Sequence, residues 1–352
     1  KQNSGRTFMF SKTYLFVSIA LSLASMAAVI YFTYDPETDF SKLQPKRWPG
    51  LFIALFVSFL RLWAAAARIR FLSDTTLSWM ASFRIMLTWD FTSSVTPSTI
   101  GGAPMATYAM TKERISLGQS TAITLFSVLL DQILYALVIP LLFIAGFFYA
   151  IIPETVGSLG TSAFVIVYVV LLLYAAILSY SVFINPGVFR KVIEFVSKWP
   201  WLRKYKSKIH DHIDDLELYS EKLRRKPFRF IWKAFLLTAG SWLARIALPT
   251  IVILSLLPAH EILSLLRSVA MNLAFFVVPT PGGSGGVEGL FTLFQAPLID
   301  QKVFVGVALF VWRFISYYIT VGLGIVAFYW YVNLTISDSD KRESEDEEFE
   351  NE

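Results

Sequence analysis

Eight ionisable residues lie inside otherwise apolar stretches of the chain: Arg61, Arg84, Asp90, Asp131, Arg245, Arg267, Glu288 and Arg313. A charged side chain at the centre of a bilayer costs about 2.5–3.5 kcal/mol on insertion scales. We therefore expect these groups to face one another or a hydrated central cavity. Five are arginines, and a planar guanidinium suits phosphate oxygens. We expect Arg84, Arg245, Arg267 and Arg313 to hold an anionic group. The structural alternative is buried ion pairs that lock helices together, for example Asp131 with an arginine.

Two apolar segments are interrupted by proline and glycine, in TPSTIGGAP at 96–104 and in PTPGGSGGVEG at 279–289. Non-helical backbone at membrane depth is tolerated only when protein buries it or it lines a wet cavity, so such breaks point to a transport site. The helices that follow should present free N–H groups, which attract anions. The candidate substrate-binding residues of the breaks are Pro97, Gly101, Gly102, Pro279, Pro281, Gly282, Gly283 and Gly285.

Glu288 follows the second break and has no carboxylate counterpart after the first. One interpretation is a gate, or a counter-ion for a cationic headgroup. The other is a carboxylate that stabilises the start of its own helix, where the helix dipole favours negative charge. Asp131 and Glu288 are the candidate proton carriers.

Composition excludes several classes of function. The hydrophobic fraction is 55%, and there are no cysteines and three histidines. A disulfide framework and a thiolate or multi-histidine metal site are therefore not expected. Motifs for a serine hydrolase, a zinc protease or a nucleotide-binding loop do not occur. We expect no cofactor, no metal and no catalytic activity. The formal net charge of +5 comes from one basic loop and indicates a membrane surface, not nucleic acid, as its partner.

Six stretches are long and apolar enough to cross a hydrocarbon core of about 30 Å: 14–34, 50–71, 118–150, 161–184, 229–257 and 302–333. The two broken segments occupy 75–111 and 261–298, and we predict that each returns to its side of entry as a re-entrant hairpin. The predicted fold class is an all-α polytopic membrane protein with six full transmembrane helices plus two re-entrant helical hairpins.

Loop charges orient this arrangement. With the N-terminus in the cytoplasm, 21 Lys and Arg residues fall in cytoplasmic segments and four fall outside, with Arg68 and Arg70 among the cytoplasmic ones. Both termini are then cytoplasmic. The predicted location is the plasma membrane of a prokaryote, as a multi-pass protein.

The two halves have the same order of elements in opposite orientation, which predicts an inverted repeat. An offset of 182 residues carries Pro97 onto Pro279, Gly101 onto Gly283 and Asp131 onto Arg313. We predict one membrane domain over 1–333, with its first half at 14–150 and its second at 161–333. The second half contains a cytoplasmic amphipathic insertion at 185–228. Residues 334–352 are predicted to be a disordered acidic tail.

The segment PGGSGGVE at 281–288 resembles the Pro-Gly-Gly-x-Gly-x-x-Glu signature of the flippase-like family, the lysylphosphatidylglycerol synthase transmembrane region. Arg313 followed by Gly322 and Gly324 is similar to the family pattern. So is the order Arg84, Pro97, Gly101 and Asp131 in the first half. The resemblance covers about residues 10–333. Many members carry Gly-Glu where this chain has Gly101-Gly102, and an arginine where it has Met105, which bears on the substrate more than on the fold.

The resemblance implies a lipid translocase whose substrate is an anionic or aminoacylated phospholipid, a glycolipid or a related polar lipid, held between the two hairpins. Bifunctional relatives add a C-terminal aminoacyltransferase domain, whereas this sequence ends in an acidic segment. We therefore expect that it does not synthesise the lipid itself. A lipid-synthesising enzyme and a second copy of the chain are candidate partners. The alternatives are a membrane enzyme acting on a lipid-linked phosphate or sugar, and a non-transporting scaffold for a lipid synthase.

Overall fold

The computed structural model describes residues 12–37, 47–96, 102–154, 157–181, 206–278, 280 and 283–350, and every regular element among them is a helix. The elements are α1 (Lys12–Thr33), α2 (Pro49–Leu72), α3 (Trp79–Val95), α4 (Gly102–Lys112), α5 (Leu117–Ala145), α6 (Gly157–Ser179), α8 (Lys206–Arg224), α9 (Phe228–Leu256), α10 (Glu261–Ala274), η6 (Phe275–Val277), α11 (Gly286–Gln295), η7 (Ala296–Leu298), α12 (Lys302–Arg313), η8 (Phe314–Tyr318) and α13 (Ile319–Glu350).

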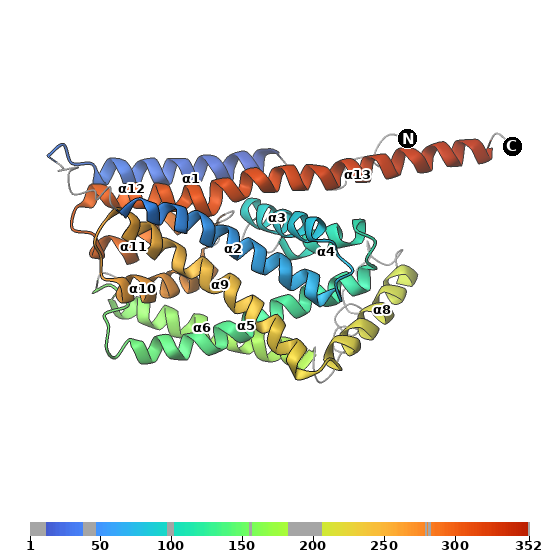
Figure 1. Ribbon diagram of the computed structural model, residues 1–352, viewed down its shortest axis with the longest axis horizontal. Coiled ribbons are helices and arrows are strands. Elements are labelled where there is room, and N and C mark those ends of the chain that lie inside the picture. Colours follow the sequence, from blue (N-terminus) through green and yellow to red (C-terminus); the bar gives the residue numbers. More distant parts are fainter. Residues whose placement is uncertain are drawn as a thin grey trace.

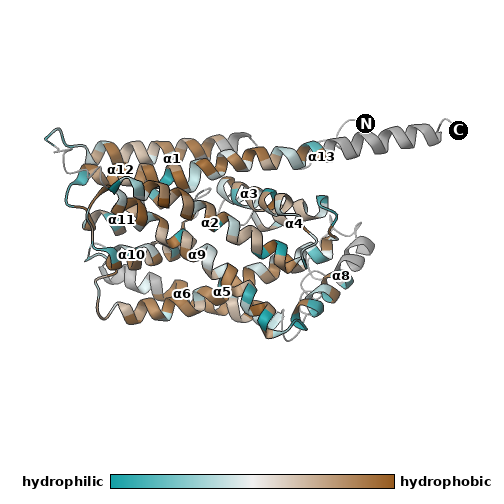
Figure 2. Cartoon of the chain, in the orientation of Figure 1, coloured by the Kyte–Doolittle hydropathy of each residue, from teal (hydrophilic) through white to brown (hydrophobic). Residues whose placement is uncertain are grey.

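Four helices are long and apolar enough to cross a membrane: α2, α5, α9 and the continuous run of α12, η8 and α13 over Lys302–Thr335. The predicted spans at 14–34 and 161–184 coincide with α1 and α6, which contribute the shorter apolar stretches Ile19–Thr33 and Val165–Ser179. Hydrophobic residues run along these long helices, whereas hydrophilic residues gather on α8 (Figure 2). The all-α membrane architecture is therefore confirmed, and the count of six spans stays a prediction.

The long helices run between two ends of the molecule (Figure 1). At one, called the α8 end, Asp74 accepts a hydrogen bond from Lys226 at 2.6 Å, and Gly118 lies against α8. At the other, called the α10 end, the start of α2 lies against the last turns of α9, and Arg267 donates to the carbonyl oxygen of Ala150 at 3.0 Å. Thus α2, α5 and α9 each extend from one end to the other.

The two broken segments fold as antiparallel helix pairs that lie towards opposite ends. Arg84, near the start of α3, reaches Glu113, just after α4, at 2.8 Å. Gln295, the last residue of α11, accepts from Ser264 in the first turn of α10 at 3.0 Å. The pair α3–α4 therefore opens towards the α8 end and the pair α10–α11 towards the α10 end (Figure 1). This arrangement agrees with the predicted opposite entry of two hairpins.

Local sequence explains where these helices begin. Ser78 and Ser116 are N-caps, whose hydroxyl oxygens accept the N–H of Ala81 at 3.1 Å and of Gln119 at 3.2 Å. Such caps satisfy donors that the first helical turn leaves free. In the second break, Gly283 and Gly285 adopt φ angles of +69° and +86°, which a residue with a side chain rarely adopts. The break therefore depends on its glycines.

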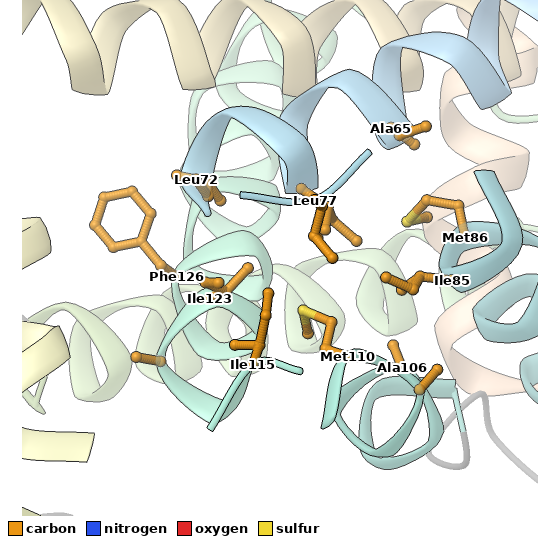
Figure 3. Close-up of a cluster of buried hydrophobic side chains, with 14 of the residues drawn as sticks. Ala65, Leu72, Leu77, Ile85, Met86, Ala106, Met110, Ile115, Ile123 and Phe126 are labelled. Atoms are coloured by element: carbon orange, nitrogen blue, oxygen red, sulfur yellow. The ribbon is translucent and has the colours of Figure 1, made fainter. Parts of the chain in front are cut away.

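Buried apolar residues form a core on each side of the arginine-rich middle. One cluster joins α2, α3, α4 and α5, with Ile69, Ile85, Met110 and Phe126 almost fully buried (Figure 3). A second joins the end of α9 with α10, α11 and α12. Each helix pair is thus packed into its own core, which fixes the depth of its break.

Residues 334–350 differ from prediction, because α13 continues as one helix to Glu350 where the sequence predicts a disordered tail. Extending an existing helix avoids the cost of nucleation, and Glu, Lys and Arg are good helix formers. Parts of the predicted cytoplasmic insertion at 185–205 lie outside the described residues.

Candidate functional site

Glu288 closes the second break. Its side chain is fully buried in the first turn of α11. One carboxylate oxygen accepts the N–H of Gly285 at 2.8 Å. This hydrogen bond confirms the interpretation of Glu288 as a carboxylate that stabilises the start of its own helix. The other accepts from Ser22 of α1 at 2.6 Å and from Arg313 Nε at 2.8 Å. Glu288 is therefore a helix cap and also an ion-pair partner that joins α1, α11 and α12.

Arg313 links this carboxylate to the first helix pair. Its guanidinium lies 4.6 Å from the ring centroid of Tyr317, one turn further along. Tyr317 packs in one cluster with Val95, the last residue of α3, and Met105, in the first turn of α4. The intervening η8 is a π-helix, a feature often found at functional sites. Residues flanking the first break therefore contact the segment that holds Glu288 of the second.

A second charged group lies between α2, α5 and α9. Asp131 accepts from Arg68 at 2.5 Å and from the indole N–H of Trp242 at 2.8 Å, and Arg68 also donates to Thr238 at 3.2 Å. The expected pairing of Asp131 with an arginine is confirmed. Arg68 is not predicted from the sequence to be the partner of Asp131. Arg68 lies near the end of a predicted span, and the charge count places it among the cytoplasmic residues. That assignment is wrong: α2 continues to Leu72 and Arg68 is buried.

The same group extends to α3 and to the second break. Arg61 of α2 pairs with Asp90 of α3 at 2.7 Å. Arg245 of α9 interacts electrostatically with Arg61, Asp90, Asp131 and Tyr135. The ring of Tyr135 lies 5.2 Å from that of Phe276 in η6. We call Arg61, Arg68, Asp90, Asp131 and Arg245 the charged cluster.

Arg245 differs from the other arginines of the charged cluster. It lies near the middle of α9, and it makes no ion pair or hydrogen bond with any residue that the structure describes. At 100° per residue, Ala234, Thr238 and Val252 share its face to within about 20°, and all three are buried. Arg245 itself is exposed. The guanidinium lies 5.2 Å from the ring centroid of Trp242 and is accessible although its neighbours on the same face of α9 are buried.

Two of the predicted anion-binding arginines instead tie their helix pairs together. Arg84 pairs with Glu113, which also accepts from Tyr331 of α13 at 2.9 Å, and it lies 3.8 Å over the ring of Trp330. Arg267 donates to the carbonyl oxygens of Phe294 and Ala150. An offset of 182 carries Arg84 to within one residue of Arg267, so the two halves use corresponding arginines at corresponding places.

The tyrosines repeat in the same way. The offset carries Asp131 and Tyr135 onto Arg313 and Tyr317. Tyr135 of the first half contacts Phe276 at the second break, and Tyr317 of the second half packs beside Val95 at the first. In each half, a tyrosine therefore contacts residues at the break of the other half. A charged residue, Asp131 or Arg313, precedes that tyrosine by one helical turn.

The glycine and proline predictions are met in part by described residues. A Cβ on Gly102 would lie 2.0 Å from Ser93 Oγ, so this glycine permits close packing of α4 on α3. Five predicted residues lie outside the described part of the chain: Pro97, Gly101, Pro279, Pro281 and Gly282.

Among the residues that the structure describes, no metal site marks the charged cluster. No group of three His, Asp or Glu side chains suited to a metal occurs among the residues with described positions. A small surface pocket lies at the α8 end, between α2, α5 and α8, where Asp74, Gln119 and Lys222 line it. The predicted hydrated central cavity therefore rests on the exposure of Arg245.

Comparison with known proteins agrees with this architecture. The model of the family described as "Lysylphosphatidylglycerol synthase TM region" matches residues 15–324. The chain is also 26% identical over 331 residues to a UPF0104 membrane protein of Archaeoglobus fulgidus, with 88% of this chain and 95% of that protein covered. The chain is thus a membrane protein that belongs to the family of the lysylphosphatidylglycerol synthase TM region.

Proposed function

We propose that this protein translocates a polar lipid across the bilayer, and that Arg245 binds an anionic phosphate in the lipid headgroup. The observation that carries the proposal is the exposure of Arg245 on the inward face of α9. A guanidinium offers several N–H donors in a planar fork that matches phosphate oxygens. At membrane depth an unpaired cation is costly, so a site of this kind is suited to an anionic ligand.

The charges around Arg245 support a ligand of negative charge. Arg61 and Asp90 form one pair, and Arg68 and Asp131 form another. These two pairs are neutral, so the charged cluster has one excess positive charge, on Arg245. A phosphodiester carries one negative charge and would balance it.

The position of the site supports transport from either side. Tyr135 connects the charged cluster with the second break, and Asp90 lies in the last turns of α3, next to the first break. We propose that the two helix pairs are re-entrant hairpins within six full spans, and that the α8 end and both termini are cytoplasmic. Opening of one pair or the other would then expose Arg245 to one leaflet at a time.

The test is lipid translocation in proteoliposomes with a fluorescent phosphatidylglycerol, read by chemical quenching of the outer leaflet. Arg245→Gln should slow translocation roughly ten- to hundredfold, because a charge-assisted hydrogen bond contributes about 1.5–3 kcal/mol. Arg225→Gln is the matched control, since Arg225 has a side chain that is 76% exposed at the α8 end, and it should leave the rate unchanged.

Three outcomes would overturn parts of the proposal. Wild-type translocation equal to that of empty vesicles, for every anionic and zwitterionic headgroup tried, would exclude a lipid translocase. An unchanged rate in Arg245→Gln would place the headgroup elsewhere. A change in the mass of the recovered lipid would favour the membrane enzyme instead, because translocation leaves the lipid chemically intact.

A further inference from the structure

A line of polar residues runs along the buried side of α5 from the α8 end to the charged cluster: Ser120, Thr124, Ser127, Asp131 and Tyr135. Their spacings of three or four residues keep all five within about 80° of one another around the helix. The line is about 22 Å long at 1.5 Å per residue, most of a hydrocarbon core of about 30 Å. We call these five residues the α5 stripe.

Several hydroxyls of the α5 stripe lack a partner. Ser120 and Ser127 are fully buried and Tyr135 is 3% exposed, yet none of the three hydroxyls has a hydrogen-bond partner among the described residues. Thr124 bonds to Thr107 of α4 at 2.9 Å. A buried hydroxyl without a partner is costly, and ordered water is the usual remedy. Three such groups on one face of one helix indicate a row of water positions.

The spacing suits bridging waters. Consecutive members of the α5 stripe are about 4.5–6 Å apart along the helix axis. A water that bonds to two hydroxyls at about 2.8 Å each spans up to about 5.6 Å, so one water bridges the gap of about 4.5 Å between Thr124 and Ser127, and two waters bridge each gap of about 6 Å. Ile123, on the neighbouring face of α5, is almost fully buried, and so are Ala122 and Phe126 further round the helix. Packing of this kind leaves no space for a lipid headgroup beside the stripe, and a proton relay needs only water-sized sites at the hydroxyls that lack a partner.

We propose that the α5 stripe is a proton path from the α8 end to Asp131, and that one proton moves with each lipid headgroup. This inference rests on the proposed function. The proton passes along hydroxyls and bridging waters to Asp131 Oδ2, the carboxylate oxygen to which neither Arg68 nor Trp242 donates, and converts the carboxylate to a carboxylic acid. No other bond forms or breaks. Arg68 then loses its anionic partner and joins Arg245 as a donor for the phosphate.

The surroundings of Asp131 fit this exchange. The ionisable groups facing it or its partners are Arg61 and Arg68 of α2, Asp90 of α3, Arg245 of α9, Tyr168 of α6 and Tyr135 of α5 itself. The charged residues described on α4 and α8 lie at the α8 end, and those on α10 lie at the α10 end, so they do not face Asp131. One proton with one phosphodiester also makes a neutral cargo, which does no work against a membrane potential that costs about 2.3 kcal/mol per charge per 100 mV.

The hydration of the stripe can be tested directly because the chain contains no cysteine. Ser127→Cys and Leu129→Cys each introduce a single thiol into the full-length protein in liposomes. Leu129 is as buried as Ser127 and two residues away, but it lies on the opposite face of α5. A small water-soluble methanethiosulfonate should modify Ser127→Cys at least about tenfold faster, because the reacting thiolate forms only where water reaches it. Equal rates would overturn the path.

Proton movement is tested in proteoliposomes that contain a trapped pH dye and labelled phosphatidylglycerol. Wild-type protein should take up one proton per lipid translocated. The triple variant Ser120→Ala, Thr124→Val and Ser127→Ala removes three hydroxyls at nearly constant volume and should slow both fluxes at least about tenfold, as loss of a water-bridged relay predicts. Thr121→Val, on the same helix but outside the stripe, should match the wild type.

The two failures are distinguishable. Lipid translocation without proton uptake, or at an unchanged rate in the triple variant, overturns the proton path and leaves the proposed function standing. Absence of lipid translocation by the wild type overturns the proposed function, and the thiol comparison still decides whether the stripe is hydrated.

Discussion

Glu288 and Arg313 should depend on each other for stability far more than a surface pair does. Arg313 Nη2 lies 2.7 Å from Glu288 Oε1, with side chains 5% and 0% exposed. Two unit charges at that separation attract by about 6 kcal/mol at an effective dielectric constant of about 20, and the loss of hydration opposes much of this. Breaking one partner leaves the other charge buried, which costs about 3–5 kcal/mol.

The perturbation is a double-mutant cycle with Glu288→Gln, Arg313→Met and both together. The glutamine side chain is an uncharged amide of nearly the same shape whose single oxygen can accept from Ser22 or from the N–H of Gly285 but not from both, so the first change removes the charge and one acceptor. We expect each single variant to lose about 3–5 kcal/mol of unfolding free energy. The double variant should lose at least about 3 kcal/mol less than the sum of the two, because neither charge is then left alone.

Equilibrium unfolding in detergent micelles measures this coupling through intrinsic fluorescence. Trp312 is a local reporter, since its ring stacks on Phe291 of α11 at 5.0 Å. The matched control is Arg225 with Glu221, 2.6 Å apart but 76% and 42% exposed, where we expect a coupling below about 1 kcal/mol. Additive losses at Glu288 and Arg313, within about 0.5 kcal/mol, would refute the argument that the pair locks the second break onto α12.

Gly324→Ala should destabilise the protein by about 1–3 kcal/mol, because the new Cβ would lie 2.5 Å from Phe91 Cβ and 2.8 Å from a backbone oxygen of α3. Gly322→Ala is the control and should be neutral or slightly stabilising, since nothing lies within 4 Å of its Cβ position. Equal thermal unfolding temperatures of the two variants would contradict the tight packing of α13 on α3. At the α8 end, burial would raise the pKa of Asp74, but hydrogen bonds and charge from Lys226 and a second lysine lower it below 3.8. Asp74 therefore stabilises the fold above pH 3.8, and this contribution is lost as the pH falls through the lowered pKa. The difference in stability between wild type and Asp74→Asn should be below about 1 kcal/mol at neutral pH and vanish in acid, and a difference independent of pH would contradict the ion pair.

The main helices could be placed from the sequence because their signal is local. The predicted spans at 50–71 and 229–257 agree with α2 and α9 to within one residue at each end. Proline removes a helical hydrogen bond and glycine weakens a helix, and where several occur together the breaks were placed correctly, between α3 and α4 and between α10 and α11. The acidic segment was less predictable, because its composition suits both a disordered tail and the continuation of α13.

The partners of the charged residues could not be predicted in the same way. Pairing depends on which way a side chain faces and on how the helices pack. Glu113 is the clearest example: it follows α4 in a basic turn, and its sequence neighbours give no sign that it bridges Arg84 and Tyr331. Arg68 was missed because it lies about one turn inside the end of the predicted span, where the sequence does not show whether a side chain faces the core or the membrane surface.

The arrangement of charge explains why Arg245, and not Arg313, is suited to a ligand. Both arginines lie near the middle of the molecule, and both were predicted to hold an anion. Glu288 already supplies the anion at the second break, and its carboxylate also occupies the position at the start of α11 that a bound phosphate would take. A headgroup would have to displace a fully buried ion pair there. At Arg245 it would not have to displace a carboxylate, because the nearby carboxylates of Asp90 and Asp131 are already paired and the guanidinium has the ring of Trp242 beside it, at 5.2 Å. A phosphate that binds Arg245 removes water from the guanidinium but does not have to displace a carboxylate partner, so more of the attraction is retained than at Arg313.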